Sequence, residues 1–470
     1  MSKLQAVQNN LLVFIILVVF FMLFGCSKEQ RNAPEVKSTK DDSILSSRLL
    51  ATIADNEKPD TSSKHETSES GEKPPEDMVI EIDKYGKGVA YIAKIGDRTC
   101  VVYNGKAGKL YDEIEAFTLI LSPNGHHVAY GAKIGDRNYV VVDGVEKGPF
   151  ADRGRISFSP DSKHVGYDAK IGNKWYMYVD NTKNEGALQY FDRPIFNKDS
   201  NKITYLEVTE ISGVYRLVVS DLQFRNNIPL TIADTAYAVN AGKTAIAAVE
   251  KNHGKWNVIS FDFMHPEKIK SGESYDDIKQ LTYSGDGKSL AYIAVKDGRS
   301  YIVLDDKKEL LPDGEYPWPF VILPDSKGVG IFIVHDKGPQ AYLHTAFLPD
   351  RGKNKTYKEG AHLTYSGDGK HYAYVAIQNE KFTIVVDGKE GPFFERVVTP
   401  QFSPDGKFLV YRARQNNKRF VVIADLNGKI IKQLPSYERV FDTAFSEDGS
   451  SVVYGVKDGN QIMLKVDKLN

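Results

Sequence analysis

The sequence predicts an all-β protein, a β-propeller of four-stranded blades, and three observations favour this fold class. One short pattern recurs ten times between residues 78 and 470. Each copy combines a tight turn of the Ser-Pro-Asp-Gly kind, an apolar strand that often ends in Ala-Tyr, and a second strand that ends in Asp-Gly. The copies are spaced roughly 37 to 44 residues apart, which is the period of propeller blades. The clearest turns begin at Ser122, Ser159, Ser284, Ser366, Ser403 and Ser446.

The third copy shows the order of elements that we expect in each blade. An inner strand, A, covers 155–158, a turn follows from Ser159, and strand B covers 164–168. A hairpin at 170–173 leads into strand C at 175–180, and a short outer strand D completes the blade. Proline fixes φ at the second turn position, while Asp and Gly tolerate the tight geometry between antiparallel strands. We therefore expect these turn residues to be structural.

Two further residue types recur about once per repeat. An aromatic residue in strand B predicts packing between blades, and only the fifth unit lacks one. The nine aromatics are Tyr91, Tyr130, Tyr167, Tyr205, Tyr292, Phe332, Tyr374, Tyr411 and Tyr454. Aspartates after strand C are expected to accept backbone N–H groups of the following turn. These are Asp143, Asp180, Asp221, Asp262, Asp305, Asp387, Asp425 and Asp467. No metal role is expected for them, because the spacing of an EF-hand loop is absent.

Ten units exceed the four to eight blades that are typical of propellers. We expect one large ring of eight to ten blades, with two smaller propellers that meet near 236–278, the most divergent unit, as the alternative. The last unit stops at Asn470 without an outer strand. Residues 79–83 are expected either to form the inner strand of the first blade or to cross over and complete the last one.

Bulk composition excludes some classes of partner. Lys and Arg nearly balance Asp and Glu in the 470 residues, and the formal net charge is −1. The strong positive field that binds nucleic acid or drives polybasic membrane docking is therefore missing. The chain has two cysteines, Cys26 and Cys100. Cys100 lies in an apolar strand, where a small buried side chain is the simplest expectation.

The N-terminus has the order of an export signal. Lys3 precedes an apolar run over 11–24, and Gly25 and Cys26 follow it. The run is shorter than the roughly 20 residues that a spanning helix needs, so a cleaved signal peptide at 1–25 is favoured over a permanent transmembrane anchor.

The residues around Cys26 resemble the box of bacterial lipoproteins, read here as Leu23, Phe24, Gly25 and Cys26, with Phe24 where the family usually has a small residue. The resemblance implies a lipid-modified Cys26 at the mature N-terminus and a place in the cell envelope. Ser27 in the next position implies the outer membrane if the organism has two membranes. Lipid chains on one cysteine would hold the protein on a bilayer without protein contacts.

Residues 26–77 are predicted to form a disordered tether. The segment is rich in Lys, Glu, Asp, Ser, Thr and Pro, and it has too little apolar surface to offset chain entropy. As a flexible coil it would reach roughly 40 Å. The propeller would then occupy 78–470.

No catalytic motif is present in the sequence. It has no Gly-x-Ser-x-Gly elbow, no His-Glu-x-x-His helix and no phosphate-binding glycine loop. Four histidines follow the A–B turns, at one repeat position that indicates a shared structural slot: His126, His127, His164 and His371. His253 and His335, in B–C connections, leave a metal site open as an alternative. We expect no catalytic residues, no cofactor and no metal.

The Ser-Pro-Asp-Gly turns and the following Ala-Tyr resemble the Pro-Asp variety of Trp-Asp repeat found in TolB-like periplasmic propellers. The resemblance covers 78–470 and implies the fold. The family's blades also occur as accessory domains of prolyl oligopeptidase-like peptidases and in some sugar lyases. Function must therefore be argued from sites.

A candidate binding face is predicted where the B–C hairpins meet. Its basic residues are Lys94, Arg98, Lys133, Arg137, Lys170 and Lys174. These form either a solvated rim that discourages edge aggregation or a cationic ring for an acidic partner or glycan. Tyr316 and Trp318, in a D–A connection, are either exposed contact anchors or packing residues. Selectivity is expected where the units disagree, at 236–278, 316–319 and 339–358.

These observations favour a non-catalytic, membrane-anchored lipoprotein whose propeller binds another protein or an envelope component. No nucleic-acid partner is expected. A glycan- or peptide-binding receptor is the first alternative, and a metal-dependent lyase or hydrolase is the second.

Overall fold

The structure is a computed structural model. It describes residues 47–52, 58–59, 80–82, 88–187, 189–208, 215–232, 236–314, 316, 320–334, 341–347, 355–446 and 448–469.

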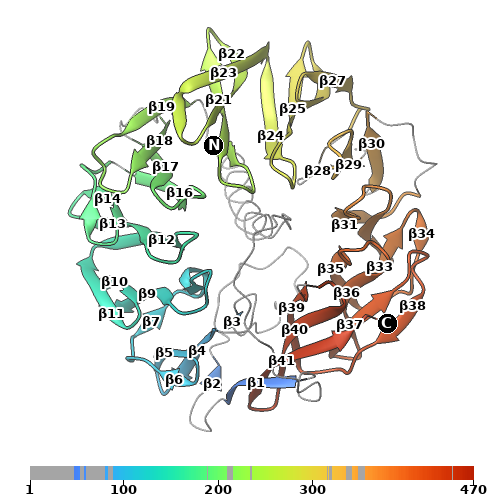
Figure 1. Ribbon diagram of the computed structural model, residues 1–470, viewed down its shortest axis with the longest axis horizontal. Coiled ribbons are helices and arrows are strands. Elements are labelled where there is room, and N and C mark those ends of the chain that lie inside the picture. The colour runs from blue at the N-terminus through green and yellow to red at the C-terminus, as the bar shows by residue number, and fades with distance from the viewer. Residues whose placement is uncertain are drawn as a thin grey trace.

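Ten small antiparallel sheets stand around one axis and form a single ring (Figure 1). Seven of the sheets have four strands, two have five, and one has three among the described residues. The prediction of one large ring is confirmed, and the alternative of two smaller propellers is wrong. The unit at 236–278 is an ordinary member of the ring, as its fifth blade.

Blades 1 to 5 follow the chain around the first half of the ring. Blade 1 consists of β2 (Lys58–Pro59), β3 (Ile80–Ile82), β4 (Val89–Ile95), β5 (Arg98–Tyr103) and β6 (Lys106–Ala107). Blade 2 consists of β7 (Glu113–Ile114), η2 (Ala116–Thr118), β8 (Ile120–Leu121), β9 (Val128–Ile134), β10 (Arg137–Val142) and β11 (Val145–Phe150). Blade 3 consists of β12 (Asp152–Phe158), β13 (Val165–Ile171), β14 (Lys174–Val179) and β15 (Thr182–Lys183). Blades 4 and 5 consist of β16 (Gln189–Phe196), β17 (Lys202–Val208), β18 (Tyr215–Asp221), β19 (Ile228–Ile232), β20 (Tyr237–Val239), β21 (Ala245–Asn252), β22 (Lys255–Asp262) and β23 (His265–Tyr275).

Blades 6 to 10 complete the ring. Blades 6 and 7 consist of β24 (Asp277–Tyr283), β25 (Leu290–Lys296), β26 (Arg299–Leu304), β27 (Lys307–Leu310), β28 (Val321–Ile322), β29 (Val329–Val334) and β30 (Ala341–Ala346). Blades 8 and 9 consist of β31 (Glu359–Tyr365), β32 (Tyr372–Gln378), β33 (Lys381–Val386), β34 (Lys389–Glu390), β35 (Arg396–Phe402), β36 (Leu409–Gln415), β37 (Lys418–Ala424) and β38 (Ile430–Gln433). Blade 10 consists of β39 (Arg439–Phe445), β40 (Ser451–Asp458), β41 (Gln461–Lys468) and β1 (Ser47–Thr52).

The core lies between neighbouring blades. Tyr130 of blade 2 is buried against Ala90 and Ile92 of blade 1, and the same packing on the preceding blade recurs around the ring. The residue after each aromatic faces the following blade. Phe332 is predicted to hold the aromatic position of blade 7, but the structure places Ile331 there. Ile331 faces blade 6, while Phe332 packs against Tyr374 of blade 8.

The A–B turns confirm their predicted structural role. In the turn from Ser403, the hydroxyl donates to Asp405 Oδ1 at 2.6 Å and accepts the N–H of Phe408 at 3.0 Å. The same two bonds recur in the other clear turns. The serine hydroxyl therefore ties both ends of each turn together.

Most of the aspartates predicted after strand C act in one of two ways, of which only one was predicted, while Asp467 accepts the Tyr454 hydroxyl instead. Asp221 and Asp425 accept N–H groups of the turn that follows them. Asp143, Asp180 and Asp387 instead have positive φ values near 50°. Their side chains therefore turn back, and Oδ1 accepts the first N–H of strand B at 3.0 Å.

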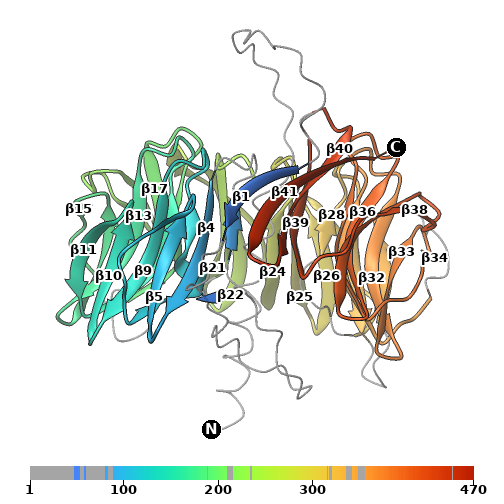
Figure 2. The same cartoon turned by 90° about the horizontal axis from the view of Figure 1, so that it is seen from below.

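Ring closure uses residues from the range predicted to be a tether. β1 pairs with β41 and is the outer strand of blade 10, and the two strands lie side by side in Figure 2. β2 and β3 share the inner edge of β4. The prediction of disorder is therefore wrong for Ser47–Thr52 and Lys58–Pro59. Of the two positions considered for 79–83, the inner strand of the first blade is correct.

Candidate functional site

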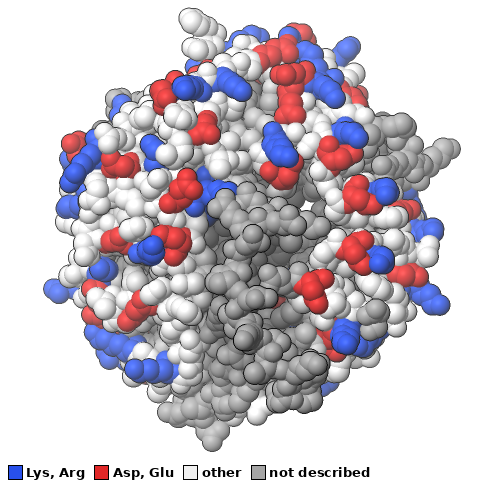
Figure 3. Space-filling model, viewed as in Figure 1, with Lys and Arg blue, Asp and Glu red and all other residues white. Residues whose placement is uncertain are grey.

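The six predicted basic residues lie at the B–C hairpins and therefore on one face of the ring. Lys94, Arg98, Arg137 and Lys174 are exposed, while Lys133 and Lys170 are half-buried. Arg98 pairs with Asp112 at 3.4 Å between Nε and Oδ1. On the face of the ring that Figure 3 shows, Lys and Arg side chains lie beside Asp and Glu, and neither charge forms a continuous patch.

Tyr316 is a packing residue. Its side chain is half-buried against the apolar cluster between blades 6 and 7, and its hydroxyl donates to the carbonyl of Pro312. The backbone carbonyl of Tyr316 accepts a hydrogen bond from Gln280 Nε2. This matches the packing alternative of the sequence prediction. Trp318 and Cys26 lie outside the described residues, so their roles stay predictions.

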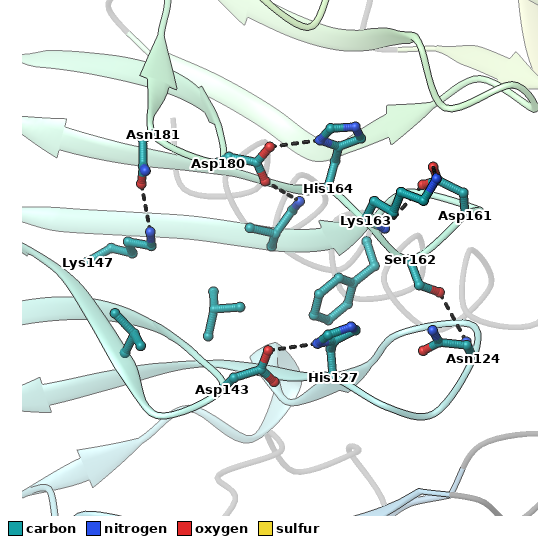
Figure 4. Close-up of a pocket in the computed structure, with 14 residues that line it drawn as sticks. Asn124, His127, Asp143, Lys147, Asp161, Ser162, Lys163, His164, Asp180 and Asn181 are labelled. Carbon is teal, nitrogen blue, oxygen red and sulfur yellow. Dashed lines mark hydrogen bonds and ion pairs between the residues drawn. The ribbon is translucent and has the colours of Figure 1, made fainter.

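A groove of about 560 Å³ opens between blades 2 and 3 (Figure 4). It is built where the A–B turns and the ends of strand C of the two blades meet. Each blade contributes the same group of residues, since Asn124, His127 and Asp143 of blade 2 correspond to Asp161, His164 and Asp180 of blade 3. The groove therefore contains two equivalent sets of side chains, one from each blade.

Two histidine–aspartate pairs flank this groove. His127 Nδ1 lies 2.8 Å from Asp143 Oδ2, and His164 Nδ1 lies 2.8 Å from Asp180 Oδ2. A carboxylate only accepts hydrogen bonds, so Nδ1 carries the proton in each pair. Nε2 then lies on the other side of the imidazole, as Figure 4 shows, and it has no hydrogen-bond partner among the described residues.

Apolar side chains form part of the groove wall. Phe158 is half-buried, and its ring centroid lies 6.4 Å from that of His127 at an interplanar angle of 34°. Val142 and Val145 line the same groove, and Val145 is 60% exposed although it is a large apolar residue. Exposed apolar surface beside paired polar groups is typical of a binding site.

The charged side chains of the groove already have partners. Lys147 Nζ donates to Asn181 Oδ1 at 2.7 Å, and Lys163 Nζ lies 3.8 Å from Asp161 Oδ2. The N–H of Asn124 donates to Ser162 Oγ at 3.1 Å, which links the two turns. Lys163 therefore lies beside a carboxylate, whereas Lys147 is bonded to an uncharged amide.

A second polar region lies near the inner strands, where the register of the A strands shifts at a bulge. Arg153 is buried and donates from Nη1 to Glu115 Oε2 at 3.1 Å. Burial lowers the pKa of Arg153 and raises that of Glu115. Nε and Nη2 of Arg153 are buried without a hydrogen-bond partner. Blades 2, 6, 9 and 10 have an apolar residue in an apolar cluster at the position of Arg153, namely Ile114, Ile278, Val397 and Val440.

Asp168 is buried in strand B of blade 3, directly after Tyr167. Its carboxylate accepts the N–H of Arg155 at 3.0 Å, and burial raises its pKa to about 7. Arg412 occupies the corresponding position in blade 9, where Nη2 lies 2.7 Å from Asp442 Oδ1. The sequence carried a signal for both residues, because a charge stands where most repeats have an apolar residue or glycine.

The groove itself also had a signal in the sequence. His127 and His164 stand at one position of two successive repeats, whereas His371 of blade 8 has no such neighbour. Among the described residues no group of three or more His, Cys, Asp or Glu side chains could hold a metal ion. Within the same part of the chain, no helix has the length and apolar character needed to cross a membrane.

No known protein family and no curated protein matches the sequence. Several solved propeller structures are similar in fold. A eukaryotic initiation factor is 15% identical over 75% of this chain and 96% of its own, with a TM-score of 0.43. TolB from Acinetobacter baumannii is 16% identical over 67% and 79%, with a TM-score of 0.28. An oligogalacturonate lyase solved with manganese is 11% identical over 84% and 96%, with a TM-score of 0.33. At these values the likenesses carry no argument about function.

Proposed function

We propose that the protein is a lipid-anchored, non-catalytic binding scaffold of the cell envelope, whose propeller binds another protein or an envelope component. The anchor would be Cys26, and the binding surface would lie on the loops and grooves of the ring. Rigid scaffolds commonly carry their binding residues in this way.

One observation carries the non-catalytic part of this proposal. The turn serines and the histidines that follow the A–B turns make the same contacts in each blade where they occur. The turn serines are tied to their aspartates, and His127, His164 and His371 all donate to the aspartate after strand C. A side chain that repeats with the same partner supports folding of each blade more readily than chemistry at one site.

The anchor is tested by Cys26→Ser. The substitution removes the thiol that would carry the lipid, so the protein should move from the membrane fraction to the soluble fraction. Cys100→Ser is the matched control, because Cys100 is fully buried and its loss leaves the N-terminus unchanged. A Cys26→Ser protein that remains with membranes after salt and carbonate washes would refute the anchor.

The scaffold is tested by crosslinking in cells, followed by mass spectrometry of the products. The expected result is a reproducible protein or envelope component linked to residues of the ring. Recovery of no reproducible partner, together with turnover of a substrate by the purified protein, would refute the proposed function.

A further inference from the structure

We infer that the groove between blades 2 and 3 binds an uncharged oligosaccharide. The inference rests on the proposed function as a binding scaffold, and it names the chemical class of the ligand and the residues that recognise it. Recognition would come from His127, His164, Asn124 and Asn181 around the side chain of Phe158.

Hydrogen-bonding groups in the groove match those of sugar hydroxyls. Asn124 Oδ1 is occupied by the Ser122 hydroxyl and the N–H of His126, which leaves its amide as a donor. Asn181 Oδ1 accepts from Lys147, so its amide is a donor too. With Nδ1 bonded to an aspartate, each histidine presents Nε2, which accepts a hydrogen bond when the imidazole is neutral. A hydroxyl both donates and accepts, and can therefore bond to either kind of group.

The apolar wall fits the other property of a sugar ring, its C–H face. Phe158 is half-buried beside His127, and Val145 is exposed next to them. Aromatic and aliphatic surface of this kind packs against C–H groups without requiring charge. About 560 Å³ is within the usual range for small-ligand sites.

The three aspartates of the lining disfavour an anionic ligand and leave an uncharged one acceptable. Asp143 and Asp180 are paired with histidines, and the Lys163 ammonium lies 3.8 Å from Asp161. The three aspartates in the lining would repel a phosphate or a carboxylate, whereas they would not repel a neutral ligand. The site is in this respect unlike an anion-binding cluster of basic side chains.

The repeat within the groove favours a ligand that itself repeats. Blades 2 and 3 present the same histidine–aspartate pair one blade apart in one cavity. Two successive sugar units could each bond to one Nε2. A single small molecule would use only one of the two equivalent halves.

Blade 8 offers a matched control. His371 Nδ1 lies 2.6 Å from Asp387 Oδ2, and Asp387 Oδ1 accepts the first N–H of strand B, as in blades 2 and 3. His371→Ala therefore removes the same local contact as His127→Ala or His164→Ala but leaves the groove unchanged.

The test is binding of neutral tetrasaccharides of glucose, mannose and N-acetylglucosamine to the full-length protein in detergent, measured by titration calorimetry. We expect saturable binding of at least one, weakened about tenfold by His127→Ala and by His164→Ala and unchanged by His371→Ala. Thermal unfolding of all three variants should be similar.

Three outcomes would overturn the inference: no binding of any of the tetrasaccharides, binding that the two groove variants leave unchanged, or equal weakening by His371→Ala. If crosslinking still recovers a protein partner in any of these cases, the scaffold function stands and only the glycan site is lost. Loss of both would refute the scaffold as well.

Discussion

Asp168 places a carboxyl group in a slot that faces the next blade and is apolar in most repeats. Gly131 and Leu206 hold the corresponding positions in blades 2 and 4. Burial raises the pKa of Asp168 to about 7, while an unfolded aspartate ionises near pH 4. The folded state therefore binds the extra proton between these values, and folding stability from this group falls as the pH rises from about 4 to 7.

Asp168→Asn should remove this dependence, because an amide does not titrate and its oxygen can still accept the N–H of Arg155. The variant should gain stability relative to the native protein between pH 5 and pH 8, by roughly 2 kcal/mol at the upper end. Urea unfolding at both pH values measures the difference. Parallel stability profiles for the two proteins would contradict the predicted ionisation.

Gly131 makes room for the buried guanidinium of Arg153. A Cβ at this position would lie 1.9 Å from Arg153 Cζ. Gly131→Ala should therefore displace Arg153 from Glu115 and lower the free energy of unfolding by about 3 kcal/mol. Gly285→Ala is the control, because an added Cβ there meets nothing within 4 Å. Equal stability of the two variants would show that Arg153 is not held in this position.

At the scale of elements, the A–B turn is the unit that repeats most faithfully. Ser403 is buried, and its hydroxyl bonds both Asp405 and the N–H of Phe408. Lys407 Nζ lies 3.2 Å from Asp405 Oδ2, and an exposed ion pair of this kind contributes little to folding stability. The two hydroxyl bonds are therefore the main side-chain support of this turn.

Ser403→Ala should lower the free energy of unfolding by about 1 to 2 kcal/mol, since it leaves the partly buried N–H of Phe408 without its side-chain acceptor. A double-mutant cycle with Asp405→Ala separates the serine–aspartate bond from the serine–backbone bond. Strict additivity of the two substitutions would mean that the hydroxyl and the carboxylate do not interact.

The turns, the strands and most of the buried tyrosines could be predicted from the sequence, because each is specified by residues within one repeat. The predicted position of Phe332 differs from the observed one by one residue because blade 7 has Leu323 where a turn serine usually stands, so the turn does not fix the register of the next strand. The groove depends on His127 and His164 meeting across two blades. That meeting is a tertiary contact, and the local pattern suggested only a shared structural slot.

At the scale of the whole molecule, closure could not be predicted from the composition of the N-terminal segment. The strand Ser47–Thr52 contains Leu49, Leu50 and Ala51, but the wider segment is rich in Lys, Asp, Glu and Ser, so the strand resembles part of a linker when taken alone. It becomes a strand because β41 offers an unpaired edge with five matching Cα partners. Pairing with the edge of the last blade therefore makes this segment a strand, although its own sequence does not predict one.

Removal of β1 should weaken the ring. Deletion of 27–57 takes away the outer strand of blade 10 and β1's pairing with β41, whereas deletion of 27–45 leaves β1 in place. The longer deletion should lower the Tm by roughly 5 °C and promote self-association through the free edge of β41. Calorimetry and size-exclusion chromatography measure both effects. Identical behaviour of the two deletions would contradict closure by β1.

The same strand decides what release from a membrane would leave behind. If Cys26 carries the lipid, a protease that cuts within 27–46 sheds a ring that keeps its closing strand. A cut within 53–57 leaves β1 covalently attached to the lipid, and the shed ring retains it only through its ladder with β41. Cleavage before β1 would thus release a propeller that keeps its closing strand, whereas cleavage after β1 would release a propeller from which β1 can dissociate.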